Sequence, residues 1–528
     1  MRVAVRETRA VPAQPLVLYG RLVTFDDARE PEVIDDGALY IGGDELIAAV
    51  QGRGEQAPPG FENAAHVETD GCIYPGLIDL HNHIVYNCLS LWSPPGQTEP
   101  YTSRYQWPRE ASYKPMISDP GTALGALAGK AQLKYVETKA VIGGVTAIQG
   151  SAKTGRPYEA WLVRNVEDET FKTKKKSVFQ SALPFRDEQG YADARRHLEA
   201  HAAFIYHLSE GTDDALVGEY EKVRDEGLLL QGFCAIHCTA LDRANYDEWV
   251  EPQRGGSVIW SPFSNLWLYA DTTDVAAAKR EGMRVCLGAD WSPSGSKHLL
   301  GELKVADLWN RSHLDGALSD PELCAMATCN PADAVNWSDR IGRLRTGLHA
   351  DVLVTTDRGG DPYRNLIESI EGDVALVTIN GYPCYGTAEL MHAAGAQHAE
   401  PITVGGHRRR IVLVYPDIPD ADMGWSDVLA KLEAVRKDPQ AHWAEVKDEV
   451  ERQHATGEGG PGDALLLRLD KPWDTERHPV EAMEAIAPDV KIPPLDALAH
   501  DTAYFDAVEA SPLHGGRLDG LRDYYRRR

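Results

Sequence analysis

Two histidines end the short segment PGLIDLHNH at residues 75–83. The apolar run after the Pro-Gly break is typical of a buried parallel strand. Side chains two apart on a strand point to the same side, so His81 and His83 should project together from the strand end. Two converging imidazoles provide half of a metal site, although an isolated pair with this spacing more often only ends a strand. The interpretation therefore depends on what the other strands contribute.

Polar residues stand at the ends of three further apolar segments. His207 ends AAFIYH, His237 ends GFCAIH and Asp290 ends RVCLGAD. If these segments are parallel strands of one barrel, their carboxyl ends share a face with His81 and His83. Imidazoles with one carboxylate suit a divalent transition metal, and a set without His237 still provides four ligands. We expect one Zn²⁺ per chain, with Fe²⁺ as the alternative; the competing interpretation is a group of buried polar residues without a metal.

The segments that carry these residues alternate with helix-length amphipathic stretches, which is the pattern of a parallel α/β fold. A helix is expected over residues 121–141, between an Asp-Pro-Gly start and a Gly-Gly stop. Eight βα units over roughly 260 residues match a closed (β/α)₈ TIM-like barrel, whose active site lies at the carboxyl ends of its strands. Besides PGLIDLHNH, strands are expected at residues 145–150, 161–166, 177–183, 202–207, 232–237, 257–262 and 284–290.

Short β-type segments flank the barrel on both sides. Residues 16–71 predict a small antiparallel sheet, and residues 341–386 give a similar succession of short strands. We expect the two pieces to form one composite β-sandwich domain into which the barrel is inserted. After residue 387 the pattern changes to mixed strands and helices, which predicts a C-terminal α+β appendage of unknown role.

The expected domain division follows these changes in pattern. The composite β-domain takes residues 1–72 and 339–387, the metal-dependent barrel takes residues 73–338, and the appendage takes residues 388–528. Within the appendage, strands are expected at residues 407–417 and 463–473, and helices at residues 425–438 and 441–453.

The composition is that of a globular protein with an acidic surface. The 528 residues carry a formal net charge of -26, which argues against nucleic-acid binding because phosphate contacts need a basic face. No signal peptide and no apolar segment long enough to span a bilayer is found, so we expect a cytoplasmic protein without a membrane partner. The eight cysteines are dispersed and predict buried free thiols. A small-molecule substrate and a homo-oligomeric assembly complete these expectations.

The chain contains the motifs PGLIDLHNH, HLSEG at 207–211, AIHCTAL at 235–241, SPFSNLWLY at 261–269, LGAD at 287–290, and ATCNPADAV followed by IGRLRTGLHADVLV. Together these motifs resemble the amidohydrolase superfamily, in its cytosine deaminase and triazine hydrolase branch. The resemblance covers residues 16–386 and implies that His81, His83, His207 and Asp290 bind a single metal. Members with two metals bridge them through a carboxylated lysine on the fourth strand, and the segment SVFQSAL ends without a lysine there.

The resemblance also implies catalytic roles for three residues. Glu210, three residues after His207, corresponds to the acid/base glutamate of the deaminases; alternatively it caps the helix that begins near Thr212. As a catalyst it would carry a proton from metal-bound water to the substrate nitrogen, with its pKa raised by burial. His237 would hydrogen-bond the attacked centre, and Asp290 would hold the water proton with the carboxylate oxygen that does not bind the metal.

A long loop, residues 84–120, follows the first barrel strand and is rich in aromatic residues. Connections of this length without regular structure are commonly lids or binding loops. Further tryptophans follow the seventh and eighth strands, which suggests a flat or apolar substrate stacked over the metal, although about half of the rings should only pack the loop onto the barrel. The candidate substrate contacts are Trp92, Trp107, Asn265, Trp267, Trp291 and His298.

The function expected from the resemblance is metal-dependent hydrolysis of a non-peptide C–N bond. Metal-bound hydroxide would attack an sp² carbon while Glu210 protonates the departing nitrogen. Deamination of an aminated heterocycle or amidine is slightly preferred, and hydrolysis of an amide, a carbamate or an aryl chloride is the alternative. A non-catalytic relative that uses the barrel as a scaffold is a further alternative, because a fold alone does not establish activity. Such a relative would be expected to lose ligands, whereas the whole set is present here.

Overall fold

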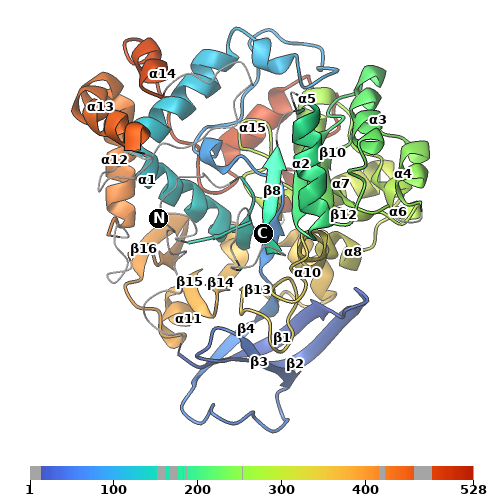
Figure 1. The fold of residues 1–528 in the computed structure, drawn as a ribbon. Helices are drawn as coiled ribbons and strands as arrows, with labels where there is room; N and C mark the ends of the chain where they lie inside the picture. The colour runs from blue at the N-terminus through green and yellow to red at the C-terminus, as the bar shows by residue number, and fades with distance from the viewer. Residues whose placement is uncertain are drawn as a thin grey trace.

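The computed structural model shows an α/β protein, in which a nine-stranded sheet lies at the lower end of the view and parallel strands with helices lie above it (Figure 1). The α/β class expected from the sequence is therefore confirmed. The structure describes residues 14–150, 162–166, 171, 176–181, 184–185, 187–251, 254–414, 422–456 and 479–526.

Eight short parallel strands carry the polar residues singled out above. They form a three-stranded and a five-stranded sheet, in the orders β5-β6-β7 and β12-β11-β10-β9-β8. A parallel bridge between Asn82 and Asp290, just beyond β5 and β12, joins the two sheets. Each of the eight expected strands is therefore found, and strands that are neighbours in the sequence are neighbours within each sheet. Their bounds are β5 (Leu77–Asp79), β6 (Val145–Ile148), β7 (Arg164–Asn165), β8 (Val178–Ser181), β9 (Ala203–Leu208), β10 (Phe233–His237), β11 (Ser257–Trp260) and β12 (Arg284–Leu287).

The parallel strands are built from apolar and largely β-branched residues. Ile78, Ile205, Ile236 and Ile259, from four different strands, belong to one buried cluster with Cys286. Branched side chains are restricted at χ1 and pack well on a pleated surface that is covered on both faces. Burial of this cluster holds the strands together and fixes where their carboxyl ends lie.

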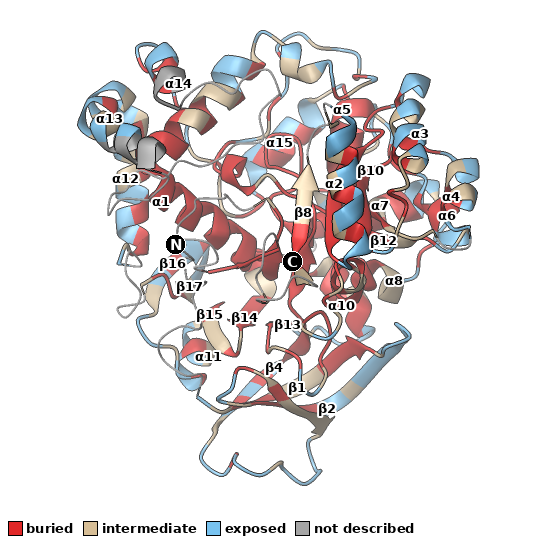
Figure 2. Ribbon diagram, in the orientation of Figure 1, coloured by how far each residue is buried: buried red, intermediate tan, exposed pale blue. Residues whose placement is uncertain are grey.

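Helix α1 (Asp119–Ile142) matches the helix expected there and is unusual in being buried on nearly all sides. By contrast, α2 (Glu188–Glu199) shows a pale blue exposed face in Figure 2. The cause is a second helix, α12 (Trp425–Lys437), which packs against α1 with Trp425 stacked on Tyr135 at 5.6 Å between ring centroids. The C-terminal part of the chain therefore covers the outer side of α1. The other helices that alternate with the parallel strands or follow them are α3 (Val217–Asp225), α4 (Arg243–Trp249), α5 (Pro262–Tyr269), α6 (Val275–Arg280), α7 (Leu299–His313), α8 (Asp320–Ala325) and α9 (Cys329–Ala334).

The strands that precede and follow the eight parallel strands in the sequence form one sheet, in the order β16-β17-β15-β14-β13-β4-β1-β2-β3. The N-terminal and C-terminal pieces meet where β4 pairs antiparallel with β13. The sheet is mixed and not antiparallel as expected, because β1 and β4 pair in parallel across the β2-β3 hairpin. The strands are β1 (Leu16–Phe25), β2 (Pro31–Ile41), β3 (Ile47–Gly52), β4 (Ala65–Pro75), β13 (Val352–Thr356), β14 (Val374–Ile379), β15 (Tyr382–Gly386), β16 (Glu400–Val404) and β17 (His407–Ile411).

The C-terminal region differs from the expected appendage in one respect. β16 and β17 lie in the range assigned to the appendage, yet they extend the nine-stranded sheet because β17 pairs with β15. The helices expected in this region are found, and the strand expected at residues 463–473 lies outside the described residues. The remaining helices are α10 (Pro362–Glu368), α11 (Ala388–Ala393), α13 (Pro439–Thr456), α14 (Pro479–Ile486), α15 (Thr502–Ala510) and α16 (Asp523–Arg526).

Two expectations about the chain as a whole can be compared with the structure. All eight cysteines are free and buried, as their dispersal predicted. In the described part of the chain, no helix combines the length and the hydropathy needed to cross a bilayer.

Candidate metal centre

Four strand ends bring histidine and carboxylate side chains together. His81 and His83 follow β5, His207 lies at the end of β9, His237 ends β10, and Asp290 follows β12. The potential ligand atoms of His81, His207 and His237 lie within 4.8 Å of one another, as do those of His81, His83 and Asp290. The structure thus places these five residues in one cluster at the carboxyl ends of the parallel strands.

The spacing of the ligand atoms fits one divalent ion. His81 Nε2 lies 3.1 Å from His207 Nε2 and 3.4 Å from Asp290 Oδ1. His83 Nε2 lies 3.6 Å from the same carboxylate oxygen. Two ligand atoms that are each about 2.0–2.2 Å from a tetrahedral ion lie roughly 3.2–3.6 Å apart. Because imidazole nitrogen and carboxylate oxygen also suit borderline divalent metals, the residues present fit such an ion.

Burial keeps the histidines in the form that binds a metal. Burial and the neighbouring histidines hold the pKa of His81 well below its usual range, and burial with Arg104 does the same for His207. Neutral imidazoles each offer a nitrogen lone pair. Burial also raises the pKa of Asp290 against the opposing effect of His83. A cation among these ligands would offset the cost of burying the carboxylate.

Polar groups behind the cluster orient its members. His81 Nδ1 lies 2.6 Å from the hydroxyl of Ser261, the residue that precedes α5. Asp79 Oδ1 accepts hydrogen bonds from the backbone N–H groups of His81 and Ala289, at 3.2 Å each. A hydrogen bond to the second ring nitrogen of a metal-binding histidine sets its tautomer and orientation. Asp79 in turn ties the chain after β5 to the chain after β12.

The backbone at several strand ends adopts the left-handed conformation. The φ angle is 66° at His237 and 61° at Asp290, and it is 51° at Ser209 and 54° at Cys238. Non-glycine residues in this region are strained, and they persist where the surrounding structure holds them, commonly at active sites. Here the backbone N–H of Asp290 donates to the carbonyl of His81 at 2.8 Å. The directions of these side chains are therefore set by the strand ends themselves.

Glu210 lies beside the cluster, in the loop after β9. Its buried Oε2 lies 3.6 Å from His237 Nε2 and 3.5 Å from Arg104 Nε. Tyr269, the last residue of α5, donates its hydroxyl to Oε1 at 2.6 Å. The alternative that Glu210 caps the next helix is wrong, because Asp213 makes that N-cap hydrogen bond.

The expected rise in the pKa of Glu210 is also wrong. Burial acts to raise the pKa, but the charges of His237 and Arg104 and the hydrogen bond from Tyr269 outweigh it, and the pKa of Glu210 lies below its ordinary value. The carboxylate is therefore in the form that accepts a proton. Arg104 was missed from the sequence because it lies in the long loop, where no periodicity marks a functional residue. Tyr269 is the last residue of the motif SPFSNLWLY, and its place in that motif was the feature of the sequence that could have identified it.

The loop after β5 folds back onto this site. The backbone N–H of Arg104 donates to the carbonyl of Glu210 at 3.1 Å. Ser103 forms an antiparallel bridge with Gly211, the residue after Glu210. Trp107 Nε1 donates to the hydroxyl of Tyr269 at 3.2 Å. The loop therefore contacts both the glutamate and the tyrosine that orients it.

Two of the candidate substrate contacts lie at the cluster. The Trp291 ring meets His83 at 72° with 6.0 Å between ring centroids, and the Trp107 ring lies 5.6 Å from Trp291. Tyr86 meets Trp291 edge-on at 5.1 Å. These rings form an aromatic wall beside the ligand atoms. A flat ring could stack against such a wall.

Three other candidate contacts have partners within the protein. Trp92 and Trp267 are buried, and Trp267 Nε1 donates to the carbonyl of Trp92 at 2.9 Å. These two indoles pack the loop onto α5, as expected for about half of the aromatic residues. Asn265 Oδ1 lies 2.7 Å from His237 Nδ1. Asn265 therefore orients a histidine of the site from behind.

His298 belongs to a separate polar group with Glu371 and His500. Glu371 Oε1 lies 3.0 Å from His298 Nε2 and 2.6 Å from His500 Nδ1, and it accepts the His500 backbone N–H at 2.9 Å. Charges on Lys297 and Lys304 act on these histidines, which disfavours a cation there. His298 is thus a buried hydrogen-bonding residue, and the expectation that it contacts substrate is corrected.

Comparisons with known proteins point to one family. Residues 192–384 match the model of the Amidohydrolase family. A 5-methylthioadenosine/S-adenosylhomocysteine deaminase from Syntrophus aciditrophicus is 28% identical over 413 residues, which cover 69% of this chain and 90% of the relative. An S-triazine hydrolase from Gordonia rubripertincta is 28% identical over 180 residues, which cover 33% of this chain and 37% of that relative.

A solved structure shares the fold. The zinc-bound adenosine deaminase from Xanthomonas campestris superposes with a TM-score of 0.56 at 18% identity, covering 81% of this chain and 98% of the other. The family match, the relatives and the fold agree with the motifs at the strand ends. The chain therefore contains an Amidohydrolase family domain, over residues 192–384.

Proposed function

We propose that this protein is a metal-dependent hydrolase that deaminates an aminated heterocycle. In this reaction water replaces the amino group on a ring carbon, and ammonia is released. The observation that carries the proposal is the ionised carboxylate of Glu210, held by Tyr269 at 2.6 Å and lying 3.6 Å from His237 beside the candidate metal ligands.

His81, His83, His207 and Asp290 would hold the metal, and zinc is the ion we propose. Their mutual distances and the neutral state of His81 and His207 support this assignment. A bound divalent metal lowers the pKa of its water and polarises the group under attack. His237 stays outside the set of four, which leaves room for water and substrate.

Glu210 would move the protons. As a carboxylate it accepts a proton from the attacking water, and it then delivers a proton to the substrate nitrogen so that a neutral amine can leave. Tyr269 and Arg104 hold the carboxylate while both transfers occur. His237 Nδ1 faces Asn265 at 2.7 Å, so Nε2 is the nitrogen available to hydrogen-bond the attacking water.

The proposed substrate class is a flat heteroaromatic amine, such as the purine of a nucleoside. The relative from Syntrophus aciditrophicus is named for deaminating 5-methylthioadenosine and S-adenosylhomocysteine. The aromatic wall formed by Trp291, Trp107 and Tyr86 supports a planar substrate. A small molecule of this kind would lie between that wall and Glu210.

A second candidate is hydrolysis of an amide, a carbamate or an aryl chloride by the same residues. The similarity of residues in this chain to an S-triazine hydrolase favours it. The two candidates share the attacking water and differ in their products: deamination of a ring amine releases ammonia and forms no carboxylate, hydrolysis of a cyclic amide forms a carboxylate, and hydrolysis of an aryl chloride releases chloride.

The finer description of the fold is also a proposal. We infer that β7 and β8 lie side by side and close the eight parallel strands into a (β/α)₈ barrel, inserted in a β-sandwich domain. The shared sheet β13-β4 and the bridge between Asn82 and Asp290 support it.

The test is a panel of aminated heterocycles, cyclic amides and carbamates, scored separately for ammonia and for carboxylate. Ammonia from an aromatic amine, lost on chelation and restored by zinc, is the expected result. Formation of a carboxylate while the amino group stays on the compound would favour the second candidate. No turnover of any compound by protein loaded with metal would favour a non-catalytic relative.

A further inference from the structure

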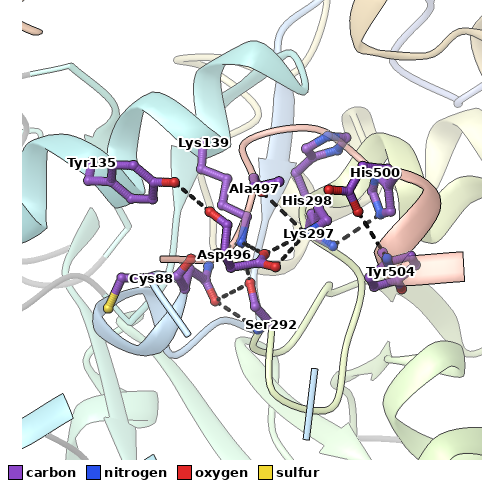
Figure 3. A network of polar contacts seen from close by, with 12 residues as sticks. Cys88, Tyr135, Lys139, Ser292, Lys297, His298, Asp496, Ala497, His500 and Tyr504 are labelled. Carbon is purple, nitrogen blue, oxygen red and sulfur yellow. Dashed lines mark hydrogen bonds and ion pairs between the residues drawn. The ribbon is translucent and has the colours of Figure 1, made fainter. Parts of the chain in front are cut away.

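The C-terminal segment inserts one carboxylate between the loops of the candidate active site (Figure 3). Asp496 lies between α14 and α15, and its side chain is buried. Lys297 Nζ donates to both carboxylate oxygens at 2.6 Å each, and Lys139 Nζ forms an ion pair with Oδ2. Both lysines are buried as well. One buried carboxylate therefore joins α1 to the loop that follows β12.

The backbone beside this carboxylate is anchored too. The N–H of Asp496 donates to the carbonyl of Cys88, in the loop after β5, at 2.9 Å. The hydroxyl of Tyr135 donates to the carbonyl of Asp496, and Lys297 Nζ donates to the carbonyl of Ala497 at 3.2 Å. The segment is thus held by the loop after β5, by α1 and by the loop after β12 at once.

Lys139 extends the contact toward the metal ligands. Its Nζ donates to the carbonyl of Asn87 at 2.8 Å and to the hydroxyl of Ser292 at 2.7 Å. Asn87 Oδ1 accepts the backbone N–H of Ser292 at 2.9 Å. Ser292 stands two residues after Asp290, and Asn87 stands four residues after His83.

Asn87 continues the path to the histidines. Its Nδ2 donates to Asn82 Oδ1 at 3.0 Å, and Asn82 Nδ2 donates to Asp79 Oδ2 at 3.0 Å. Asp79 Oδ1 holds the backbone N–H groups of His81 and Ala289. An unbroken chain of polar contacts therefore runs from Asp496 to residues that flank the candidate ligands on both β5 and β12.

We propose that Asp496 is a positioning residue for the metal centre, so that the C-terminal region is part of the active-site framework. This inference rests on the proposed function. Asp496 contacts neither a metal ligand nor the substrate. It acts through Lys139, which fixes the positions of Asn87 and Ser292 relative to each other. Ligand geometry within a few tenths of an ångström decides metal affinity, and partners behind the ligands commonly set it.

The chemistry of the contact supports a role beyond attaching the C-terminal region. Burying one carboxylate and two ammonium groups is costly, whereas apolar side chains such as Phe505 already pack this region onto the core. Burial lowers the pKa of Lys139 to about 8 even with Asp496 beside it. Without the carboxylate, two buried ammonium groups would face each other without a counter-charge, and α1 and the loop after β12, which carry them, would shift apart.

The test compares Asp496→Asn with a matched change, Asp506→Asn, which removes an exposed carboxylate paired with Arg522 in the same C-terminal region. The readouts are the dissociation constant for Co²⁺, its visible absorption spectrum, and kcat and KM. We expect Asp496→Asn to weaken Co²⁺ binding and to lower kcat by about tenfold each, with an altered spectrum and little change in KM. Asp506→Asn should match the wild type.

A lower melting temperature in Asp496→Asn, with Co²⁺ affinity and spectrum unchanged, would reduce Asp496 to a structural contact and overturn the proposal. If Asp496→Asn does not fold, Ser292→Ala decides, because it removes only the hydroxyl that Lys139 reaches at 2.7 Å. This variant should shift the Co²⁺ spectrum and affinity in the same direction, and wild-type values would contradict the proposal. Co²⁺ binding needs no substrate, so failure of the proposed deamination would not be confused with failure of this inference.

Discussion

Replacing Glu210 with glutamine should remove most of the turnover and leave the metal centre assembled. The glutamine side chain has nearly the same size, and its oxygen can still accept the Tyr269 hydroxyl that lies at 2.6 Å in the native protein. An amide cannot take up and release a proton in the neutral pH range. None of the four proposed metal ligands is changed.

The magnitude follows from the two proton transfers. General acid–base catalysis contributes about 10²–10⁴-fold to a rate, or about 2.7–5.4 kcal/mol in the barrier. Folding should be affected less. Arg104 loses the carboxylate at 3.5 Å, but the charge of Glu219 remains in its surroundings. Removing one partner of a buried ion pair costs about 3–5 kcal/mol. The free energy of unfolding should fall by less than this.

The assay measures kcat by ammonia release and metal by elemental analysis, with Glu226→Gln as the matched variant. Glu226 pairs with Lys222 at the outer end of α3, away from the site. Glu226→Gln should retain the wild-type kcat, and Glu210→Gln should retain metal while losing turnover. More than about a tenth of the wild-type kcat in Glu210→Gln would exclude Glu210 as the group that transfers the protons. Loss of metal together with activity would show instead that Glu210 is needed to assemble the metal centre.

Three further results are expected. Ser261→Ala removes the hydroxyl at 2.6 Å from His81 Nδ1 and should weaken metal binding by about 10–100-fold in a chelator competition; unchanged affinity would show that this hydrogen bond does not orient the ligand. Arg164→Met leaves the buried carboxylate of Asp351, which Arg164 Nη2 contacts at 2.9 Å, without a counter-charge, and should lower the free energy of unfolding in urea by about 3–5 kcal/mol; a loss below about 1 kcal/mol would contradict the prediction. Burial lowers the pKa of His500 to about 3, so the unfolded chain binds a proton here that the native protein does not, and stability should fall as the pH drops from about 6.5 toward 3; His500→Gln should flatten this dependence, and an equally steep curve in the variant would exclude His500 as its source.

The residues of the candidate metal centre could be predicted because two simple periodicities combine. An apolar segment that ends in a polar residue predicts a strand with a side chain at its carboxyl end, and parallel strands gather those ends on one face. This reasoning brought His81, His83, His207, His237 and Asp290 together, and the structure places them in one cluster. It required no knowledge of the loops.

The contacts made by loops and by segments far apart in the sequence could not be predicted. The pKa of Glu210 was predicted in the wrong direction because only burial was considered, whereas the charges of His237 and of Arg104 lower it, and Arg104 comes from a long loop without a repeating pattern. The parallel pairing of β1 with β4 depends on how the β2-β3 hairpin folds aside. Asp496 meets Lys139 across 357 residues of chain, and no local pattern encodes such a pairing. His298 was placed near substrate from its position in the sequence, whereas its side chain is bound to Glu371.

One divalent metal at the strand ends should be required for hydrolytic deamination by this protein. The most direct measurement titrates zinc into metal-free protein and follows ammonia release from an aromatic amine that the native protein turns over. The rate should rise linearly and level off at one zinc per chain, with no carboxylate formed. A plateau only at two zinc ions per chain, full turnover without metal, or carboxylate in place of ammonia would contradict this prediction.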